Sequence, residues 1–299
     1  MGNDELTRFK TEINLSEYSA SLGYFMDKKE SSRNSVAMRH QDGDKIIISR
    51  RSETWIYFSV RDRGDNGTII DFLKNRGCAD IGQVRIRLRD WLGSPHVEIS
   101  KSLYVDNVQA ICPNRSMVRT AWNKAKICEY LPYLSVRGLK PDVIGNDRFK
   151  GCLRADWRNN ALFPHYDHEG ICGYEVKNKG FTGFAPGGIK GLWTSRKKKE
   201  DNQLVIVESA IDAISYYILH DNNSTRYIST GGELNPQQPG LIREEIEKLP
   251  AGSTIKIACD NDHGGEKIAT EIRAVIPSVY TALREIPEIG KDWNEMLLK

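Results

Sequence analysis

Three acidic residues in the last third of the chain have the types and spacing of a metal site. Glu208 directly follows the apolar run 203–207, and Asp260 and Asp262 directly follow the apolar run 254–259. In an extended segment, carboxylates at alternate positions point the same way. Clustered carboxylates repel one another unless a cation lies between them, and a ligand set made of oxygen alone favours a hard ion. The pattern therefore predicts a site for Mg²⁺ or Mn²⁺ if the two runs are neighbouring strands.

The elements that must position these residues alternate between strands and helices. Strands are predicted at 203–207, 226–229, 254–259 and 279–282, and helices at 210–220, 241–249 and 266–275. This alternation favours a mainly parallel sheet covered by helices. In such sheets, functional groups gather beyond the carboxyl ends of the strands. A lone D-x-D is more often an ordinary acidic loop, but here an acidic residue follows each of two apolar strands.

Four segments of this region resemble the Toprim family. They are 205–213 (VIVESAIDA), 230–232 (TGG), 259–267 (CDNDHGGEK) and 290–294 (GKDWN). Toprim proteins include bacterial primases, topoisomerases, certain nucleases and recombination proteins. The resemblance implies a Rossmann-like α/β domain in which Glu208, Asp260 and Asp262 hold Mg²⁺ for phosphoryl transfer or strand cleavage.

Three further residues of these segments have two interpretations each. Asp212 lies one helical turn beyond Glu208 and is either a metal-site group or a solvated helix acid. Lys267 either neutralises phosphate as part of the catalytic set or is an ordinary surface lysine. Asp292 is either a further acidic member of the site or the N-cap of a short helix.

The middle of the chain is similar to the part of bacterial primases that precedes their Toprim domain. The similarity lies in 133–139 (YLSVRGL), in 160–173 (NALFPHYDHEGICG) and in 191–193 (GLW). In primases this region carries a basic surface that holds template and incoming nucleotide. The resemblance therefore implies a nucleic-acid or nucleotide-binding role for Arg137, Lys177, Lys179 and Lys190, although a lone lysine is more often simply solvated. Thr182 stands where primases tend to have asparagine, so the similarity leaves nucleotide polymerisation open.

The N-terminal region resembles a primase zinc ribbon that has lost its zinc. Residues 58–72 (FSVRDRGDNGTIIDF) keep the glycines and the Asp-Phe helix, but Val60 and Arg63 stand where the cysteines would be. Zinc requires thiolate or imidazole ligands, so no zinc is expected. We expect apolar packing by Trp55, Phe58 and Ile70 to replace the metal.

Basic and aromatic residues alternate in this N-terminal region. Arg61 and Arg63, together with Arg50 and Arg51, are interleaved with Trp55 and Tyr57. Such a surface could grip single-stranded DNA by charge and stacking. A solvated, arginine-rich sheet face is the competing interpretation.

Composition restricts the range of functions. The 299 residues carry a net charge of only +3, so contact with nucleic acid must come from local patches. No apolar run approaches the roughly 20 residues that span a bilayer, and the N-terminus lacks a signal peptide. The six cysteines form no C-x-x-C pair and are expected to be reduced thiols. We therefore expect a cytoplasmic protein without membrane partners.

The predicted fold is mixed α/β and α+β in three parts. Residues 1–93 form a degenerate ribbon-like β-hairpin domain, residues 94–200 a linker (to about 114) and a primase-like domain, and residues 201–299 the Toprim domain. This order resembles Toprim proteins encoded on bacterial plasmids and integrative elements.

Three functions are compatible with these patterns. The first is a primase-like nucleotidyltransferase that uses Mg²⁺ or Mn²⁺ with a DNA template and nucleoside triphosphates. The second is a metal-dependent nuclease or nickase that uses the same carboxylates. The third is a non-catalytic DNA-binding factor that acts with replication or conjugation proteins of a mobile element. A topoisomerase is disfavoured, because the chain has no room for a strand-gating domain.

Overall fold

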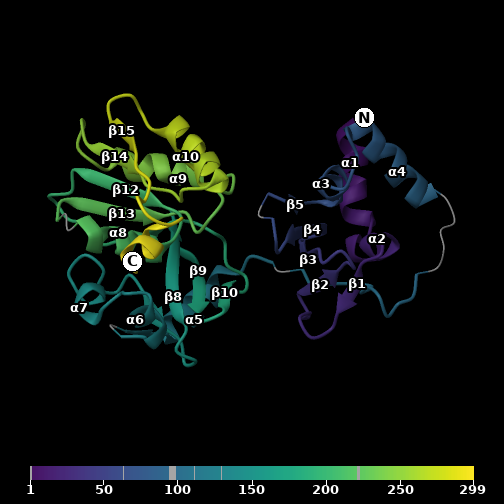
Figure 1. Cartoon of the computed structure of the whole chain (residues 1–299), viewed down its shortest axis with the longest axis horizontal. Coiled ribbons are helices and arrows are strands. Elements are labelled where there is room, and N and C mark those ends of the chain that lie inside the picture. Colours follow the sequence, from purple (N-terminus) through teal and green to yellow (C-terminus); the bar gives the residue numbers. More distant parts are fainter. Residues whose placement is uncertain (1, 63, 94–98, 111, 129, 221–222) are drawn as a thin grey trace. The chain divides into compact units, whose positions relative to one another are not determined.

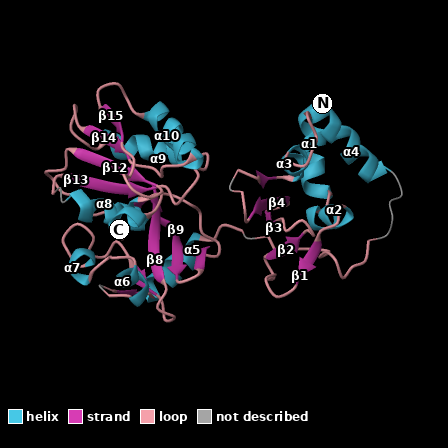
Figure 2. Cartoon of the chain, in the orientation of Figure 1, coloured by secondary structure: helices cyan, strands magenta, loops and turns pink. Residues whose placement is uncertain are grey.

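The computed structural model describes residues 2–62, 64–93, 99–110, 112–128, 130–220 and 223–299. The chain divides into two units, Met1–Cys112 and Pro113–Lys299 (Figure 1). Both contain helices and strands, which confirms the mixed fold class (Figure 2). Every helix in the described ranges is too short or too polar to cross a lipid bilayer.

An antiparallel sheet with strand order β1–β2–β3–β4–β5 forms the centre of the first unit. Its strands are β1 (Phe25–Asp27), β2 (Ser35–Arg39), β3 (Lys45–Arg51), β4 (Thr54–Ser59) and β5 (Asn66–Gly67). The helices of this unit are α1 (Gly2–Glu12), α2 (Leu15–Ser21), α3 (Ile69–Lys74) and α4 (Ile81–Gly93).

The predicted hairpin of the first unit is confirmed as β3 and β4. Ile48 pairs with Tyr57 across the two strands, and both side chains are buried together with Trp55. Phe58 points from the opposite face of β4 and is 50% exposed. The expectation that Phe58 packs in the core in place of zinc is therefore wrong, because neighbouring residues of a strand point to opposite faces and Trp55 and Tyr57 occupy the inner one.

Helix α3 begins with Thr68 as its N-cap. The Thr68 hydroxyl accepts a hydrogen bond from the Ile70 N–H, and the Asp71 carboxylate accepts one from the Thr68 N–H at 2.8 Å. Gly67 has φ +133°, and a Cβ at this position would overlap the Asp71 carboxylate. The glycine and aspartate of the ribbon-like motif thus have a structural role that requires no metal.

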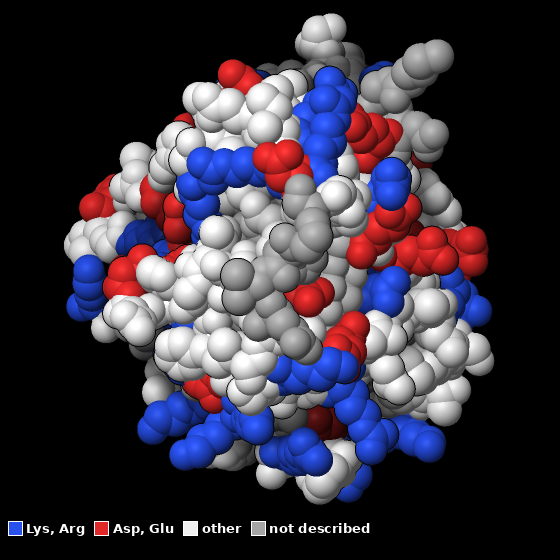
Figure 3. Space-filling model, turned by 90° about the vertical axis from the view of Figure 1, so that its right-hand side faces the viewer, with Lys and Arg blue, Asp and Glu red and all other residues white. Residues whose placement is uncertain are grey.

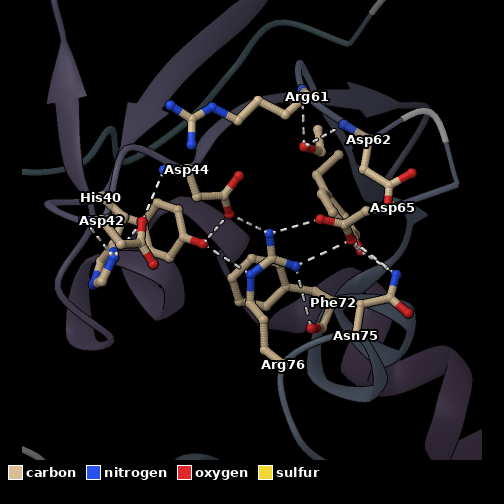
Figure 4. A network of polar contacts seen from close by, with 12 residues as sticks. His40, Asp42, Asp44, Arg61, Asp62, Asp65, Phe72, Asn75 and Arg76 are labelled. Carbon is tan, nitrogen blue, oxygen red and sulfur yellow. Dashed lines mark hydrogen bonds and ion pairs between the residues drawn. The ribbon is translucent and has the colours of Figure 1, made fainter.

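A guanidinium group, that of Arg76, joins the sheet to the end of α3 (Figure 4). Nη2 donates to the carboxylates of Asp44 at 2.7 Å and Asp65 at 2.9 Å, and Nε donates to the Tyr24 hydroxyl at 2.9 Å. The guanidinium also lies 4.1 Å from the centre of the Phe72 ring. Burial alone would raise the pKa of Asp65, but its hydrogen bonds, foremost that from Arg76, lower it below the ordinary value. Polar contacts therefore supplement the apolar packing that the sequence predicted for this unit.

The segment before residue 113 is not a free linker over its described part. Tyr104 and Val108 are buried in the core of the first unit. The Asn14 side-chain amide donates to the carbonyl of Val105 at 2.7 Å. Two large apolar side chains and this backbone contact fix residues 103–108 to the first unit. The predicted break at Ser94 and Pro95 lies outside the described residues.

The second unit contains two sheets. The first is antiparallel, with order β10–β9–β8–β7–β6, and the second has order β11–β13–β12–β14–β15. The antiparallel strands are β6 (Lys126–Ile127), β7 (Arg154–Ala155), β8 (Ala161–Asp167), β9 (Gly170–Asn178) and β10 (Phe181–Phe184). They are accompanied by α5 (Arg115–Lys124), α6 (Pro132–Val136) and α7 (Pro141–Ile144).

The second sheet follows the predicted alternation of strands and helices. Its strands are β11 (Trp193–Thr194), β12 (Gln203–Val207), β13 (Thr225–Ser229), β14 (Thr254–Ile257) and β15 (Thr281–Arg284). Its helices are α8 (Ala210–His220), α9 (Gln238–Glu247), α10 (His263–Val275) and α11 (Trp293–Leu297). All pairs are parallel except that of β11 with β13. The four predicted strands and three predicted helices are all present, with ends shifted by a few residues.

One core joins the two sheets of the second unit. Ala155 and Phe163 of the antiparallel sheet pack in the same buried cluster as Trp193 and Val205 of the α/β sheet. Beside this core, Arg148 forms a buried ion pair with Asp201 at 2.7 Å. The middle region and the α/β region therefore pack together as one unit, and this packing holds the antiparallel sheet against the α/β sheet.

Candidate active site

Glu208 and Asp260 meet at one edge of the parallel sheet. Strands β12 and β14 are neighbours, and the ladder ends with a hydrogen bond from Ala258 N–H to Ile206 O at 2.8 Å. The Glu208 carboxylate accepts a hydrogen bond from the backbone N–H of Asp260 at 3.2 Å. Both residues are 7% exposed. The expectation that the two strands are neighbours is confirmed, and it brings these two acidic residues together.

Asp262 lies at the start of α10, next to this pair. Its carboxylate caps the helix by accepting the Gly265 N–H at 2.8 Å, and its side chain is 35% exposed. A Cβ at Gly265 would overlap the carbonyl oxygen of Asp260. Glycine is therefore required where α10 closes on the loop that carries Asp260 and Asp262.

The carboxyl group of Asp260 is buried among other acidic residues. Its Oδ1 atom is buried and has no hydrogen-bond partner among the described residues. Burial raises the pKa of Asp260 to about 8, and the negative charges of Glu208, Asp212 and Asp292 act in the same direction. A buried carboxylate with an unpartnered oxygen and acidic neighbours is an arrangement that a cation would stabilise.

Lys291 supplies a positive charge at this point. Its Nζ lies 2.8 Å from Asp262 Oδ2 and 3.7 Å from Asp260 Oδ2. The backbone helps to place it, because the Asn261 N–H donates to the Lys291 carbonyl at 2.8 Å. Trp293 is buried behind it, and its indole N–H donates to the Ala258 carbonyl at 2.7 Å.

Asp212 and Asp292 lie close enough to the site to act on the pKa of Asp260. Asp212 is buried and accepts hydrogen bonds from the Ser209 hydroxyl at 2.5 Å and the Asn294 N–H at 3.3 Å. Burial, and then the charge of Asp292, raises the pKa of Asp212 to about 6. Asp292 caps α11 by accepting the Glu295 N–H at 2.7 Å, as the simpler interpretation of the sequence expected. Asp212 is thus buried and hydrogen-bonded, and it is not a solvated helix acid.

Arg284, at the end of β15, binds the carbonyl groups of the loop between β14 and α10. Its guanidinium donates to the carbonyl oxygens of Cys259 and Asp260, each at 2.9 Å. It also forms an ion pair with Glu266 at 2.6 Å. The backbone on either side of the Asp260 side chain is therefore fixed from the neighbouring strand.

The donor set of this edge fits a hard divalent ion. Glu208, Asp260 and Asp262 offer only oxygen, and the unpartnered Oδ1 of Asp260 is available as a ligand. Within the described ranges, no three His, Cys, Asp or Glu side chains converge closely enough to enclose an ion alone. Mg²⁺ commonly keeps several waters and is held by one or two carboxylates together with substrate phosphates, which suits such an open set.

Two lysines named from the sequence point elsewhere. The Lys267 ammonium pairs with Glu233 at 3.0 Å, and its side chain is 59% exposed. The Lys190 ammonium donates to the carbonyl oxygens of Glu233 and Gly231. Both side chains contact the loop after β13.

Lys177 faces the acidic site from the antiparallel sheet. Its ammonium pairs with Glu175 at 2.9 Å, and Glu175 lies 3.3 Å from the ring of the buried His165. Burial alone would lower the pKa of Lys177, but Glu175 and then Asp212 raise it above its ordinary value. Since Lys177 in turn acts on the pKa of Asp212, the two charges lie within electrostatic range of each other.

A cavity of about 790 Å³ lies between α6 and the β9–β10 hairpin, and its lining begins on β9 at Asn178, the residue after Lys177. Tyr133, Arg137, Lys179 and Phe181 are among its lining residues. Phe181 is 53% exposed, and Lys179 is exposed as well. Arg137 donates to the Asn294 side chain at 3.1 Å and so connects the cavity wall to the segment that contacts Asp212. The structure thus brings together Arg137 and Lys179, with two aromatic rings.

The basic residues of the first unit are arranged differently from the expectation. Arg61 is exposed, and Arg63 lies outside the described residues. Trp55 and Tyr57 are 4% and 3% exposed, so they cannot stack on DNA bases as the sequence suggested. Phe58 is the exposed aromatic residue of β4. On the face of the molecule in Figure 3, Lys and Arg side chains gather along the lower edge, in keeping with local basic patches rather than a uniform positive field.

Three groups near the site were missed in the sequence. Lys291 lies within a segment already noted for its resemblance, but nothing in its spacing shows that it reaches Asp262. Arg284 could not be identified from the sequence, because it donates to backbone carbonyl groups, which every residue has. His165 belongs to the crowded run 165–168, which looks like a surface loop in sequence, whereas the structure buries His165 completely in β8.

Two family models match the second unit. Residues 205–297 match a family described as Toprim-like, and residues 132–202 match a family described as a protein of unknown function (DUF3991). The predicted Toprim domain is therefore confirmed. No curated protein matches the sequence.

Two solved structures are similar to parts of the chain. The primase fragment of the bacteriophage T7 primase-helicase protein is 14% identical, with a TM-score of 0.41, and the match covers 92% of this chain and 93% of that one. The second is a bacteriophage T7 lagging-strand DNA polymerase interacting with primase domains of two gp4 subunits bound to an RNA/DNA hybrid and dTTP. It is 17% identical, with a TM-score of 0.41, and the match covers 58% of this chain and 85% of that one.

Proposed function

We propose that this chain, which carries a Toprim-like domain, is a primase-like enzyme that joins nucleotides on a DNA template with the help of a divalent metal. One observation carries the proposal: Glu208 and Asp260 are buried side by side beyond the ends of neighbouring parallel strands, with Asp262 next to them. In open α/β sheets, ligands bind at the edge beyond the carboxyl ends of the strands.

Glu208, Asp260 and Asp262 would hold Mg²⁺ or Mn²⁺. The bound ion would polarise a phosphoryl oxygen and neutralise the charge that develops during transfer. Asp212 and Asp292 would add negative charge around the ion without contacting it. Arg284 would keep the Asp260 backbone in place through the carbonyl of that residue.

The antiparallel sheet would hold the nucleic acid and the nucleotide. Lys177 is a partly buried cation, with a side chain 13% exposed, that pairs with Glu175, so it would neutralise a phosphate that approaches the acidic edge. The cavity between α6 and the β9–β10 hairpin offers Tyr133 and Phe181 for stacking, and Arg137 and Lys179 for phosphate contact. Single-stranded nucleic acid is bound by such combinations of aromatic and basic side chains.

The order of the three regions supports a cytoplasmic role in replication or conjugation of a plasmid or integrative element, since it resembles Toprim proteins of those elements. Single-stranded DNA and nucleoside triphosphates are the proposed ligands, and the replication or conjugation proteins of the element are the proposed partners.

A direct test incubates the full chain with single-stranded template, labelled nucleotides and Mg²⁺ or Mn²⁺, beside a plasmid-nicking assay and a mobility-shift assay. New labelled strands are expected from the wild-type chain. Asp260→Ala combined with Asp262→Ala should remove them while the fold is retained. Glu244→Ala combined with Glu247→Ala, on the outer face of α9, removes the same charge away from the site and should change little.

The other outcomes identify the alternatives. Nicked circles without synthesis mean a nuclease that uses the same acidic residues. A mobility shift without either reaction means a DNA-binding factor. Normal synthesis by the Asp260/Asp262 double variant would show that the site is elsewhere.

A further inference from the structure

Lys291 contacts two of the three carboxylates that the proposed function gives to a metal, those of Asp260 and Asp262. Its Nζ is 2.8 Å from Asp262 Oδ2 and 3.7 Å from Asp260 Oδ2, both within ion-pair range. Lys291 is also the only positive group among the main causes that act on the pKa of Asp260. Asp262 Oδ1 already accepts the Gly265 N–H, so the oxygen atom that Asp262 would offer a metal is the Oδ2 that the Lys291 ammonium contacts. An ammonium and a divalent ion cannot both hold that atom.

The protein backbone directs Lys291 to this place. The Asn261 N–H donates to the Lys291 carbonyl, and the Lys291 N–H donates to the Glu295 carboxylate, each at 2.8 Å. Gly290 has φ +86°, and a Cβ there would lie 2.8 Å from the same Glu295 carboxylate. With Trp293 anchored to Ala258, the segment is fixed on both sides of the lysine. The position of the ammonium therefore follows from the fold and not from a chance rotamer of a surface side chain.

We propose that the Lys291 ammonium is an internal counter-ion of Asp260 and Asp262, which a divalent metal displaces when it binds. The inference rests on the proposed function, because it takes the same acidic residues as metal ligands. In this role Lys291 keeps the two carboxylates together before the metal arrives, and it raises the metal concentration at which the site fills. Once displaced, the ammonium stays near the site on its flexible four-carbon stem and can meet a phosphate of the substrate.

The effect on metal affinity distinguishes this role from a purely structural salt bridge. A structural role predicts that removal of Lys291 loosens the site and weakens metal binding. Competition predicts the opposite, because the variant no longer has to release an ammonium. The Lys291 side chain is 39% exposed, so the competition is modest, and loss of the lysine should tighten binding about fivefold.

The first measurement is binding of Mn²⁺ to the full chain, followed by the electron paramagnetic resonance signal of the free ion. Lys291→Met should bind Mn²⁺ about fivefold more tightly than the wild type. Lys248→Met removes the same charge from the end of α9, where that lysine pairs with Glu245, and should bind like the wild type. Equal or weaker binding by Lys291→Met would overturn the inference.

A second measurement follows the lysine itself in the wild-type chain, and so does not depend on how a variant folds. Amines are acetylated briefly with and without saturating Mn²⁺, and modified lysines are quantified by mass spectrometry. Labelling of Lys291 should rise several-fold with metal, while that of Lys248 stays constant. Unchanged labelling of Lys291 in metal-loaded protein would overturn the displacement.

The Asp260→Ala variant distinguishes a failure of the counter-ion inference from a failure of the proposed metal site. If it abolishes Mn²⁺ binding but Lys291→Met does not tighten it, the inference fails and the proposed metal site stands. If Asp260→Ala leaves Mn²⁺ binding intact, or the wild type binds none, both are overturned.

Discussion

The carboxylate of Glu208 accepts a hydrogen bond from the backbone N–H of Asp260, at 3.2 Å and across 52 positions of sequence. The contact uses the N–H of Asp260 and leaves the carboxylate of that residue beside Glu208, with its own Oδ1 atom unpartnered among the described residues. Two acidic side chains are thus held together by the main chain of neighbouring strands. This geometry imposes a free-energy cost on the metal-free protein, because acidic groups are held close together where they are buried.

Asp260→Asn should stabilise the metal-free protein at alkaline pH. The pKa of Asp260 is about 8 in the folded chain, against an ordinary value of 3.8. Between about pH 4 and pH 8 the folded state therefore keeps a proton that the unfolded state has lost, so stability falls as pH rises through this window. Asparagine removes the ionisation and should raise the free energy of unfolding at pH 8 by roughly 1–3 kcal/mol.

Urea unfolding in the presence of a chelator, at pH 5 and pH 8, measures this effect. The wild type should lose more stability between the two pH values than Asp260→Asn does. Glu247→Gln serves as the control and should follow the wild type, because Glu247 lies on the surface of α9 and its partner Arg243 is charged at both pH values. A less stable Asn variant at pH 8 would contradict the argument from buried charge.

Mg²⁺ or Mn²⁺ should raise the melting temperature of the wild-type chain. A ligand that binds only the folded state stabilises it by about 2.7 kcal/mol at a hundredfold excess over its Kd, which corresponds to several degrees for a unit of this size. The Asp260→Ala and Asp262→Ala double variant should show no such shift in differential scanning fluorimetry. A metal-dependent shift of the same size in both proteins would place the binding site elsewhere.

Arg284→Met should weaken metal binding although Arg284 is not a proposed ligand. The guanidinium donates to the carbonyl oxygens of Cys259 and Asp260 at 2.9 Å, so its loss releases the backbone that aims the Asp260 carboxylate. We expect roughly tenfold weaker Mn²⁺ binding, the order of effect known for groups that orient metal ligands. Arg243→Met, which breaks an exposed pair with Glu247 on α9, is the matched control.

The readout for Arg284 must distinguish positioning from general destabilisation. Calorimetric titration with Mn²⁺ well below the melting temperature does so, because the chain is then folded in every sample. A lower melting temperature with unchanged Mn²⁺ affinity would mean that Arg284 only stabilises the sheet.

The sequence predicted the acidic pair because the topology leaves little freedom. Apolar runs that alternate with amphipathic helices become parallel strands, and parallel neighbours end at the same edge. Glu208 and Asp260 each follow such a run, so their meeting depended only on β12 and β14 being adjacent. Lys291 could not be predicted in the same way. Its approach to Asp262 depends on where the loop after β15 is anchored, and that is decided by the burial of Trp293.

In the first unit, the sequence did not predict which face of the sheet is buried. Alternation in β4 separates Trp55 and Tyr57 from Phe58, but it does not say which face is buried. The helices that cover the sheet decide this, and they bury Trp55 and leave Phe58 half exposed. The hydrogen bonds of Arg76 could not be predicted from the sequence either. They join residues from distant parts of the chain through side-chain contacts, which leave no periodic pattern.

Arg76→Met should destabilise the first unit strongly. The substitution leaves the carboxylates of Asp44 and Asp65 without their shared partner, at positions where the side chains are only 24% and 14% exposed. Removing one partner of a buried ion pair leaves the other charge without a partner. We therefore expect the free energy of unfolding of this unit to fall by about 2–4 kcal/mol. Amide hydrogen exchange of β2 to β4 in the full chain measures the stability of this unit directly, and Arg8→Met, which breaks an exposed pair with Glu12, is the control.

The same variant should change how the first unit responds to acid. Because the folded-state pKa of Asp65 lies below the ordinary value, its contribution to stability is fully present above that value, near pH 4, and is lost as pH falls through the lower, folded-state value. The wild-type unit should therefore lose protection from exchange on acidification below about pH 4, whereas Arg76→Met should respond less, since Asp65 no longer has its main partner. Equal protection of wild type and variant at neutral pH, together with equal acid sensitivity, would show that apolar packing alone holds this unit together.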